Sequence, residues 1–372
     1  MKSKSRLFPE VLGYRLFRAF GHPKMMPINV TVSITNMCNS RCKTCYIWNR
    51  YKRHPEKKRD ELTADEFEKT FEGLGKQVFW TTISGGEPSL RTDLPRICEA
   101  LCDFCEPALI NIPSNGLLPA TLKDRTREIL QRCPETTVIV NLSLDGVGFE
   151  HDNIRGVKGS FERFAESYSR LKSLREEFSN LQIGVHSVIS RFNINRMSFL
   201  YDLAEKLDPD SYITEVAERR TELFNIGKNI TPESEEYASV IDQLSDRIRN
   251  GYLHSDRALS RLTQAFRLTY YQIAIQELRE QRQIIPCYAG YASCQITPYG
   301  DVWPCCILGY DRPMGNLRDM NYDFRQVWFS KKADEVRKYI KSRNCACPLA
   351  NAHYTSILCN FHSMFGVLKN AL

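Results

Sequence analysis

The stretch VTVSITNMCNSRCKTCY, residues 30–46, joins an apolar, β-branched segment to a polar loop that holds three cysteines. Its first six residues predict a buried strand, because β-branched side chains fit a pleated sheet and no charge interrupts them. Asn, Ser and Thr in the loop form local hydrogen bonds and disfavour a helix there. The stretch therefore predicts a strand followed by a polar loop, the position where β/α folds carry their functional residues.

The same alternation of strand and helix continues to residue 216. Six β/α repeats predict parallel strands with crossover helices, in an open sheet or a partial barrel. We therefore expect an α/β fold, a partial (β/α)6 TIM-like barrel. The predicted helices are 63–74, 92–105, 119–132, 160–177 and 194–207, and the later strands are 78–83, 108–112, 136–144, 181–189 and 210–216.

The composition changes beyond residue 216. Thr231-Pro232 and the acidic residues after it are typical of a helix start, and a second helical pattern follows. After residue 284, Gly, Pro and Cys become frequent, and a strand, a turn, a strand and a last helix at about 323–341 are predicted. We expect a basic N-terminal segment (1–27), the barrel (28–216), a helical linker (217–284) and a small Cys-rich C-terminal domain (285–372).

Positive charge is concentrated near the N-terminus. Residues 1–59 hold 14 Lys and Arg against two Glu, in a chain whose net charge is +7. This indicates a polyanionic partner, an anionic membrane surface or a solvated basic leader. Residues 8–21 could form an amphipathic helix at a membrane surface or pack against the barrel. No apolar run approaches a membrane span, and no signal peptide is recognisable, so we expect a cytoplasmic protein.

Two of the cysteine groups have the same Cys-x3-Cys-x2-Cys spacing. Cys98, Cys102 and Cys105 fall on one face of a predicted helix. Seven residues of helix rise about 10 Å, so these thiols do not converge on one small cluster. Buried free cysteine behaves as a small apolar side chain, and we expect all three to face the core together with Cys133.

The other triplet, Cys38, Cys42 and Cys45, lies in the loop of the opening stretch. A loop can turn three thiolates toward one centre, and the cations Arg41 and Lys43 would lower the thiol pKa values. Three thiolates suit an iron–sulfur cluster with one open iron, whereas a structural zinc site needs four ligands.

The triplet resembles the iron–sulfur motif of the radical S-adenosylmethionine (SAM) enzymes. The resemblance extends to Tyr46 and to SGGEP at 84–88, and it covers roughly residues 28–216. It implies a 4Fe–4S cluster on the three cysteines that binds SAM. One electron from the cluster cleaves SAM to methionine and a 5′-deoxyadenosyl radical, which abstracts a hydrogen atom from the substrate.

The resemblance also implies a SAM-binding site at the ends of the first four strands. Gly85, Gly86 and Glu87, an exposed carboxylate, would contact the amino group of SAM. An arginine suits the SAM carboxylate, because its guanidinium makes two parallel bonds. The remaining expected contacts are Tyr46, Asn115, Ser143, Asp145 and Arg155.

The C-terminal cysteines resemble the twitch and SPASM extensions, which bind auxiliary 4Fe–4S clusters. The pattern is Cys287, a spacer, Gly300-x4-Cys305 and a close pair, although the pair is Cys345-x-Cys347 where Cys-x2-Cys is usual. We expect one auxiliary cluster on these four cysteines. A zinc site is the alternative for these four cysteines. For Cys294, Cys306 and Cys359 the alternatives are a second cluster or a place in the core.

An auxiliary cluster indicates oxidation of the substrate. Fewer than 40 residues precede Cys38, which favours dehydrogenation of a sugar-like or aminocyclitol-like intermediate. Cross-linking or epimerisation of a ribosomal peptide is the alternative. Glu215, at the end of the sixth strand, is the candidate base. A flavodoxin-type or ferredoxin-type reductant is the expected partner, and a non-enzymatic iron–sulfur or zinc protein that binds nucleic acid is the alternative of another class.

Overall fold

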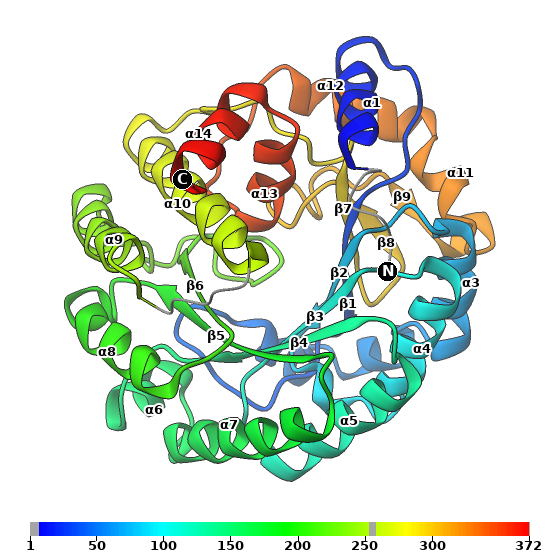
Figure 1. Ribbon diagram of the computed structural model, residues 1–372. Helices are drawn as coiled ribbons and strands as arrows, with labels where there is room; N and C mark the ends of the chain where they lie inside the picture. Colours follow the sequence, from blue (N-terminus) through cyan, green and yellow to red (C-terminus); the bar gives the residue numbers. More distant parts are fainter. Residues whose placement is uncertain (1–6, 253–257, 372) are drawn as a thin grey trace.

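In the computed structural model, which describes residues 7–252 and 258–371, six parallel strands form a curved sheet (Figure 1). Each strand pairs with the next one in the chain, so the predicted α/β partial barrel is confirmed. The strands are β1 (Asn29–Thr35), β2 (Trp80–Gly85), β3 (Leu109–Ser114), β4 (Thr137–Ser143), β5 (Leu181–Ile189) and β6 (Ser211–Val216).

Amphipathic helices cover the outer face of this sheet (Figure 1). Their apolar sides and the outward side chains of the strands form one core, to which Phe71, Leu101 and Val140 belong. Thr63 and Glu66 form a capping box that starts the first of these helices. The helices are α3 (Ala64–Leu74), α4 (Leu94–Cys105), α5 (Pro119–Arg132), α6 (Phe149–Arg155), α7 (Ser160–Glu177) and α8 (Met197–Leu207).

The inner face of the sheet is polar. Along β3 and β6, buried residues alternate with half-exposed ones, and the half-exposed set includes Asn111 and Glu215. Asn141 donates to the side-chain oxygen of Asn111 on the neighbouring strand, and His186 lies further along on β5. Because side chains alternate across a strand, these polar residues share the face away from the helices.

Three C-terminal strands extend the same sheet. β7 (Ser293–Ile296) pairs in parallel with β1, on the side that β2 leaves free. β8 (Asp301–Trp303) and β9 (Gly315–Asn316) follow as antiparallel neighbours. The predicted strand, turn and strand of this region thus belong to one nine-stranded sheet with the barrel.

The last predicted helix is divided in two. α11 (Phe324–Trp328) and α12 (Lys331–Lys341) replace the expected helix over 323–341. Ser330 interrupts the helix, because its side chain accepts a hydrogen bond from the N–H of Ala333 and so caps α12. α9 (Ser234–Arg249) and α10 (Ala258–Glu280) lie between the two halves of the chain, and α13 (Ala350–Leu358) and α14 (Phe361–Ala371) pack on α10.

The amphipathic segment near the N-terminus forms α1 (Leu7–Phe20), which packs on the C-terminal part of the chain. Tyr14 and Phe17 are buried against Tyr288 and Tyr291, and Arg18 donates to the carbonyl of Cys287 at 3.0 Å. The helix therefore packs within the molecule, but on the cysteine-rich region rather than on the barrel helices. Within the described ranges, no helix is both long and apolar enough to cross a membrane.

Candidate active site and auxiliary cysteine site

The loop at residues 36–46, here called the cysteine loop, leaves the end of β1 and lies against the end of β2. The N–H of Gly86 donates to the carbonyl of Thr35 at 2.7 Å, and that of Glu87 donates to the carbonyl of Met37 at 2.8 Å. A Cβ atom on Gly85 would lie 2.1 Å from the Thr35 oxygen, and one on Gly86 would lie 2.2 Å from the Met37 oxygen. The two glycines therefore allow the backbones to approach closely.

The C-terminal end of α6 holds the other side of the cysteine loop. Arg41 and Lys43 donate backbone hydrogen bonds of 2.9 Å to the carbonyls of Arg155 and Ile154. Gly156 has a φ of +69°, and a Cβ atom there would lie 2.3 Å from the Arg41 oxygen. The sequence analysis missed Gly156. A glycine at a helix end was the available signal, although it does not reveal this contact.

Glu87 is buried, so the expectation of an exposed carboxylate is wrong. Only 1% of the residue is exposed, and Oε1 accepts from the Ser89 and Ser114 hydroxyls at 2.7 and 2.9 Å. Oε2 accepts from the N–H of Asn115 at 2.7 Å. Glu87 thus fixes the turn after β3. Its contact with SAM stays a prediction, and that contact would exchange one of these bonds.

Arg155 and Asp145 form a buried ion pair beside the cysteine loop, with an Nη1–Oδ2 distance of 2.9 Å. Burial lowers the pKa of Arg155, but the neighbouring Cys42 and Asp145 outweigh it and raise the pKa. The Nε atom of Arg155 is buried and has no hydrogen-bond partner. A buried donor without a partner is costly, so the guanidinium is suited to a carboxylate ligand.

The other predicted SAM contacts lie at the ends of neighbouring elements. Asn115 donates to the side-chain oxygen of Asn39 at 2.7 Å and approaches Cys38 Sγ at 3.9 Å. Tyr46 ends the cysteine loop, and its ring lies 5.2 Å from Lys228 Nζ. Ser143 is half-buried at the end of β4, opposite His186 on β5.

Backbone N–H groups point at two sulfurs of the cysteine loop. The N–H of Ser40 donates to Cys38, and that of Ile47 donates to Cys45. Burial nevertheless raises the pKa of Cys38 to about 12 and also raises that of Cys45. Half-buried thiols with donors aimed at sulfur suit a cationic cluster, which stabilises thiolates and is tuned by such bonds.

The prediction that Arg41 and Lys43 lower these pKa values is wrong. Arg41 is exposed, and Lys43 donates to Asn153 at 2.9 Å. Arg155, ten residues after Asp145, is the cation that lowers the pKa of Cys38. Proximity in sequence misled here, because Ser40 and Thr44 are buried while Arg41 is exposed and Lys43 is engaged by Asn153.

The cysteines of α4 lie in the core, as predicted. Cys98 and Cys105 are fully buried, and Cys133 is 2% exposed. Cys105 donates to the carbonyl of Phe71 at 3.5 Å, and Cys102, which is half-buried, bonds to Thr136 at 3.5 Å. These thiols fill gaps between α4 and its neighbours.

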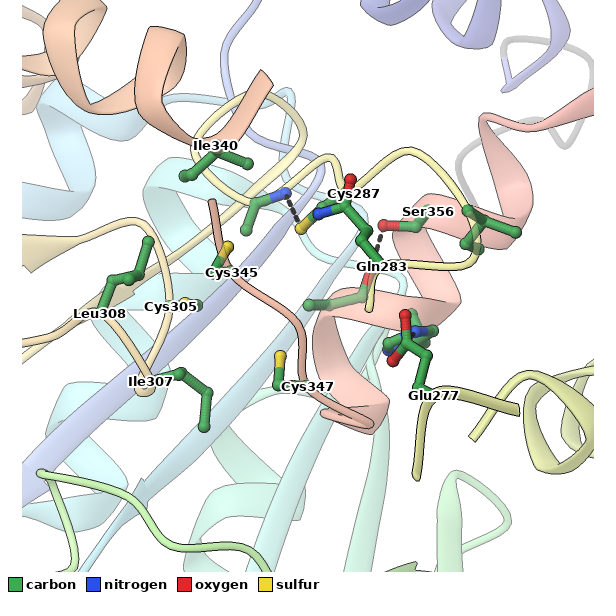
Figure 2. A pocket seen from close by; sticks show the side chains of 14 residues that line it. Glu277, Gln283, Cys287, Cys305, Ile307, Leu308, Ile340, Cys345, Cys347 and Ser356 are labelled. Atoms are coloured by element: carbon green, nitrogen blue, oxygen red, sulfur yellow. Dashed lines mark hydrogen bonds and ion pairs between the residues drawn. The ribbon is translucent and has the colours of Figure 1, made fainter. Parts of the chain in front are cut away.

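Four C-terminal cysteines line one cavity, here called the auxiliary cavity (Figure 2). They are the four that the sequence predicts as ligands, and Figure 2 shows them pointing into the same space. Apart from the cysteines, the cavity is lined by apolar side chains and by the polar residues Glu277, Gln283, His353 and Ser356. The cysteines are Cys287, Cys305, Cys345 and Cys347.

The sulfurs of the auxiliary cavity resemble those of the cysteine loop. The N–H of Ala289 donates to Cys287 Sγ at 3.4 Å, and those of Ile307 and Leu349 donate to Cys305 and Cys347. Burial, with the neighbouring thiol of Cys305, raises the pKa of Cys287 to about 12. As in the cysteine loop, thiols that receive backbone N–H hydrogen bonds at sulfur suit an iron–sulfur cluster.

The remaining cysteines of this region do not line the auxiliary cavity. Cys294 lies in the main core, Cys359 packs near α1, and Cys306 bonds to Glu222. Among the described residues, no three His, Cys, Asp or Glu side chains lie close enough to hold a single metal ion.

Glu215 lies on the inner face at the end of β6, and it is one of three carboxylates near Arg220. Arg220 Nη2 is 3.5 Å from Glu215 and 2.6 Å from Glu218. His186 Nε2 is 3.7 Å from Glu215. Burial raises the pKa of Glu218, whose Oε1 atom has no partner, and of Glu222. Sequence analysis missed Arg220, although the charged run at 215–222 was visible.

The loop at residues 217–233 connects the two cysteine sites. Asn225 donates to the carbonyls of Thr44 and Glu218 at 2.8 and 3.0 Å, and the N–H of Tyr46 donates to the carbonyl of Leu223 at 2.8 Å. Glu218 in turn raises the pKa of Cys347 in the auxiliary cavity, after burial. Arg220 and its neighbouring carboxylates, Glu215, Glu218 and Glu222, thus lie between the cysteine loop and the auxiliary cavity.

Two family models match the chain. The model of the radical SAM superfamily matches residues 32–187, and SPASM, an iron–sulfur cluster-binding domain, matches residues 287–348. The first match contains the cysteine loop, and the second contains the four cysteines of the auxiliary cavity.

Curated relatives cover most of the chain. The antilisterial bacteriocin subtilosin biosynthesis protein AlbA of Bacillus subtilis is 27% identical over 80% of the chain. The mycofactocin maturase MftC of Mycolicibacterium smegmatis is 26% identical over 89% of the chain. The chain spans 59% of the length of AlbA and 78% of that of MftC.

Solved structures share the fold. Streptococcus suis SuiB bound to its precursor peptide SuiA superposes with a TM-score of 0.60 at 17% identity, over 90% of this chain and 70% of SuiB. The same protein bound to SAM has a TM-score of 0.59 at 19% identity, over 84% of this chain and 68% of SuiB.

Proposed function

The chain belongs to the radical SAM superfamily and carries a C-terminal SPASM domain, and from this premise we propose that it modifies a peptide. The observation that carries the proposal is that the loop at 217–233 joins two cysteine sites, with Arg220 of that loop beside the inner-face carboxylate of Glu215. Radical SAM and SPASM domains use SAM and 4Fe–4S clusters.

The relatives support a peptide better than the sugar-like or aminocyclitol-like substrate that the sequence favoured. AlbA acts in the biosynthesis of a bacteriocin, MftC is a maturase, and SuiB is solved with a precursor peptide. We propose cross-linking or epimerisation of a ribosomal peptide. Oxidation of the substrate, and the oxidoreductase class with it, is part of the proposal and depends on the auxiliary site.

We propose specific ligands for the cofactors. Cys38, Cys42 and Cys45 would hold the cluster that binds SAM. Cys287, Cys305, Cys345 and Cys347 would hold the auxiliary cluster. When bound, the first cluster and SAM supply the radical that removes a hydrogen atom from the substrate.

The residues of the chain bind and orient SAM in this proposal. Arg155 would bind the SAM carboxylate with its unpartnered Nε edge, while Asp145 holds the guanidinium in place. The backbone at Gly85 and Gly86 would meet the amino group, because it lies against the start of the cysteine loop. Tyr46, Asn115 and Ser143 would complete the site.

Glu215 is the proposed base. It lies on the inner face with 20% of its side chain exposed, so a substrate can reach it. Arg220 orients the carboxylate, and Glu218, also bound to Arg220, lies on the side of the auxiliary cavity. A proton taken from the substrate would rest on Glu215, while the pair of Arg220 and Glu218 holds the carboxylate in place.

All fourteen cysteines are free thiols in this structure. Free clustered thiols persist in a reducing compartment, which supports the proposed cytoplasmic location.

Anaerobic reconstitution tests the proposal. With dithionite as reductant, the iron-replete protein should convert SAM to 5′-deoxyadenosine, and Cys38→Ala should abolish this. Glu215→Gln should still cleave SAM when no substrate is present. When substrate is present, the variant should form no product. A reduced, iron-replete protein that makes no 5′-deoxyadenosine would contradict the enzyme reading.

The substrate class needs a second experiment. The protein is co-expressed with short peptides encoded in its own genome, and the peptides are analysed by mass spectrometry. Cross-linking removes two hydrogens, whereas epimerisation leaves the mass unchanged in H2O and adds a deuterium in D2O. Turnover of an aminocyclitol, with no change in any peptide, would reinstate the sugar-like substrate.

A further inference from the structure

A strongly cationic surface follows the cysteine loop directly. Residues 47–60 form three short helices, η2 (Ile47–Asn49), α2 (Arg50–Arg53) and η3 (Pro55–Asp60). Between residues 41 and 59 the chain has eight Lys and Arg and one Glu. Every residue from 52 to 60 is exposed. We call the exposed set Lys52, Arg53, Lys58 and Arg59 the cationic ridge.

Among the residues that the structure describes, the ridge cations have no acidic partner. Two ion pairs occur beside it, Lys57 with Asp60 at 2.9 Å and His54 with Glu56 at 3.5 Å. In the part of the chain that the structure describes, no carboxylate lies within ion-pair distance of the four ridge residues. Clustered like charges repel one another, and an acidic partner relieves this repulsion.

The ridge is directly connected to the cysteine loop. Trp48 is half-buried, and its indole N–H donates to the carbonyl of Cys45 at 2.9 Å. Lys52 Nζ lies 5.0 Å from the centre of the Trp48 ring. A partner on the ridge is therefore separated from Cys45 by one aromatic side chain and one hydrogen bond.

The base of the ridge is held rigidly. Arg50 Nε donates to the Tyr299 hydroxyl at 2.8 Å, and its guanidinium lies 5.1 Å from the Phe224 ring. Tyr51 bonds to Glu61 and contacts the Tyr299 hydroxyl at 3.0 Å. Arg50 lies over the rings of Phe224 and Tyr299, so these ring faces are already partly occupied within the molecule, which disfavours stacking on nucleic-acid bases.

We propose that the cationic ridge is the docking surface for an acidic one-electron carrier protein of the flavodoxin or ferredoxin class. The inference rests on the proposed function. The docked carrier would lose one electron, and Cys38, Cys42 and Cys45 would hold the cluster that accepts it. No proton or group moves in this step. Charge complementarity selects the carrier and raises its association rate.

Charge-removing variants of the ridge test the proposal. Lys52→Gln, Arg53→Gln, Lys58→Gln and Arg59→Gln are combined in one protein. The control combines four exposed cations elsewhere, Lys172→Gln, Lys206→Gln, Lys331→Gln and Lys332→Gln, and loses the same net charge. Binding of a purified acidic flavodoxin to the cluster-loaded proteins is measured by calorimetry at low and moderate salt.

The ridge variant should bind flavodoxin about tenfold more weakly at low salt and lose most of the salt dependence. The control should bind like the parent protein. Reduction of the cluster by dithionite, which needs no docking, should be equal in all three. If the fourfold variant folds poorly, the double variant Lys58→Gln with Arg59→Gln replaces it. It should show a smaller loss of flavodoxin binding in the same direction.

Equal flavodoxin affinity in the ridge and control variants would overturn the proposal. Displacement of flavodoxin by a synthetic oligoglutamate peptide at equal affinity would also overturn it, because the ridge would then be a general polyanion site. Dithionite-driven cleavage of SAM tests the proposed function separately, since it does not involve the ridge.

Discussion

Peptide N–H groups two residues further along the chain point at five cysteine sulfurs, those of Cys38, Cys45, Cys287, Cys305 and Cys347. Each such bond favours the thiolate over the thiol and offsets part of the cost of burial. The same local geometry recurs in both sites. It marks the sulfurs that are held ready for a ligand.

Single substitutions should separate these cysteines from those of α4. Cys45→Ala should lose about half of the iron after anaerobic reconstitution, because one of two clusters is no longer held. Cys98→Ala, the control, should keep its iron and lose about 1 kcal/mol of unfolding free energy. Iron analysis and urea unfolding measure the two effects. Equal iron loss in both variants would contradict the assignment.

Gly156 should be as important as a cysteine for the first site. Gly156→Ala places a Cβ atom 2.3 Å from the Arg41 oxygen, so the cysteine loop must shift and its iron should be lost. Gly148→Ala is the matched control, since its φ is also positive, at +56°, but no atom lies within 4 Å of the added Cβ. Iron content and SAM binding are the measurements. Retention of both by Gly156→Ala would show that the loop tolerates the shift.

His151 should make stability depend on pH. Burial, with the nearby Arg155, lowers the pKa of His151 to about 4 from 6.5. Between these values the unfolded chain binds a proton that the folded protein does not, so stability falls as pH falls through this window. The loss approaches about 3 kcal/mol near the lower end.

His151→Gln should remove this part of the pH dependence. The variant keeps an acceptor for the N–H of Asp145, which donates to His151 Nδ1 at 3.2 Å. Urea unfolding of both proteins, at a pH above 6.5 and at a pH between 4 and 6.5, gives the change in unfolding free energy of each. Parallel pH profiles of the two proteins would contradict the assignment.

At the scale of elements, α1 attaches the N-terminal end to the cysteine-rich region. Phe17 packs edge-on against Tyr291 with ring centroids 5.4 Å apart, and the guanidinium of Arg337 lies 5.0 Å from its ring. Arg18 contacts the carbonyl of Cys287, a proposed cluster ligand. The helix therefore packs against the segment around Cys287, which lines the auxiliary cavity.

Phe17→Ala should destabilise the protein by about 4 kcal/mol, because it leaves a cavity in this contact. Phe20→Ala is the control on the same helix. Phe20 is 77% exposed, so its loss should change the unfolding free energy by less than about 0.5 kcal/mol. Urea unfolding compares the two. Similar effects would show that α1 does not dock as described.

The sequence predicted the elements of the barrel well, because strong periodicity determines them. Helices 119–132 and 160–177 and strand 181–189 begin and end as predicted. The partners of α1 could not be predicted, since they lie about 270 residues away in the chain. The cysteines of the auxiliary cavity could be predicted from their spacing, whereas Arg220 and Gly156 act through contacts that no local pattern shows.

At the scale of the molecule, one sheet runs from β6 to β9. The division into segments 1–27, 28–216, 217–284 and 285–372 stays a prediction. Backbone hydrogen bonds between β1 and β7 join the barrel to the C-terminal part. Together with the packing of α1, this joins the two ends of the chain.

The protein should therefore unfold in one transition. Scanning calorimetry of the cluster-loaded protein should give a single peak, because neither part keeps a closed core without the other. A version that ends at residue 284 leaves β1 with one unpaired edge and uncovers Tyr14 and Phe17, and we expect it to aggregate. Two separate peaks, or a soluble and folded shortened protein, would contradict this expectation.

The pairing of β1 with β7 also limits how such proteins can recombine. Asn29 to Val32 lie opposite Ser293 to Ile296, and β1 continues without a break into the cysteine loop. A chimaera that exchanges the C-terminal part with that of a relative must preserve this register. We therefore expect β1 and the hairpin of β7 and β8 to be inherited together, although most of the chain lies between them.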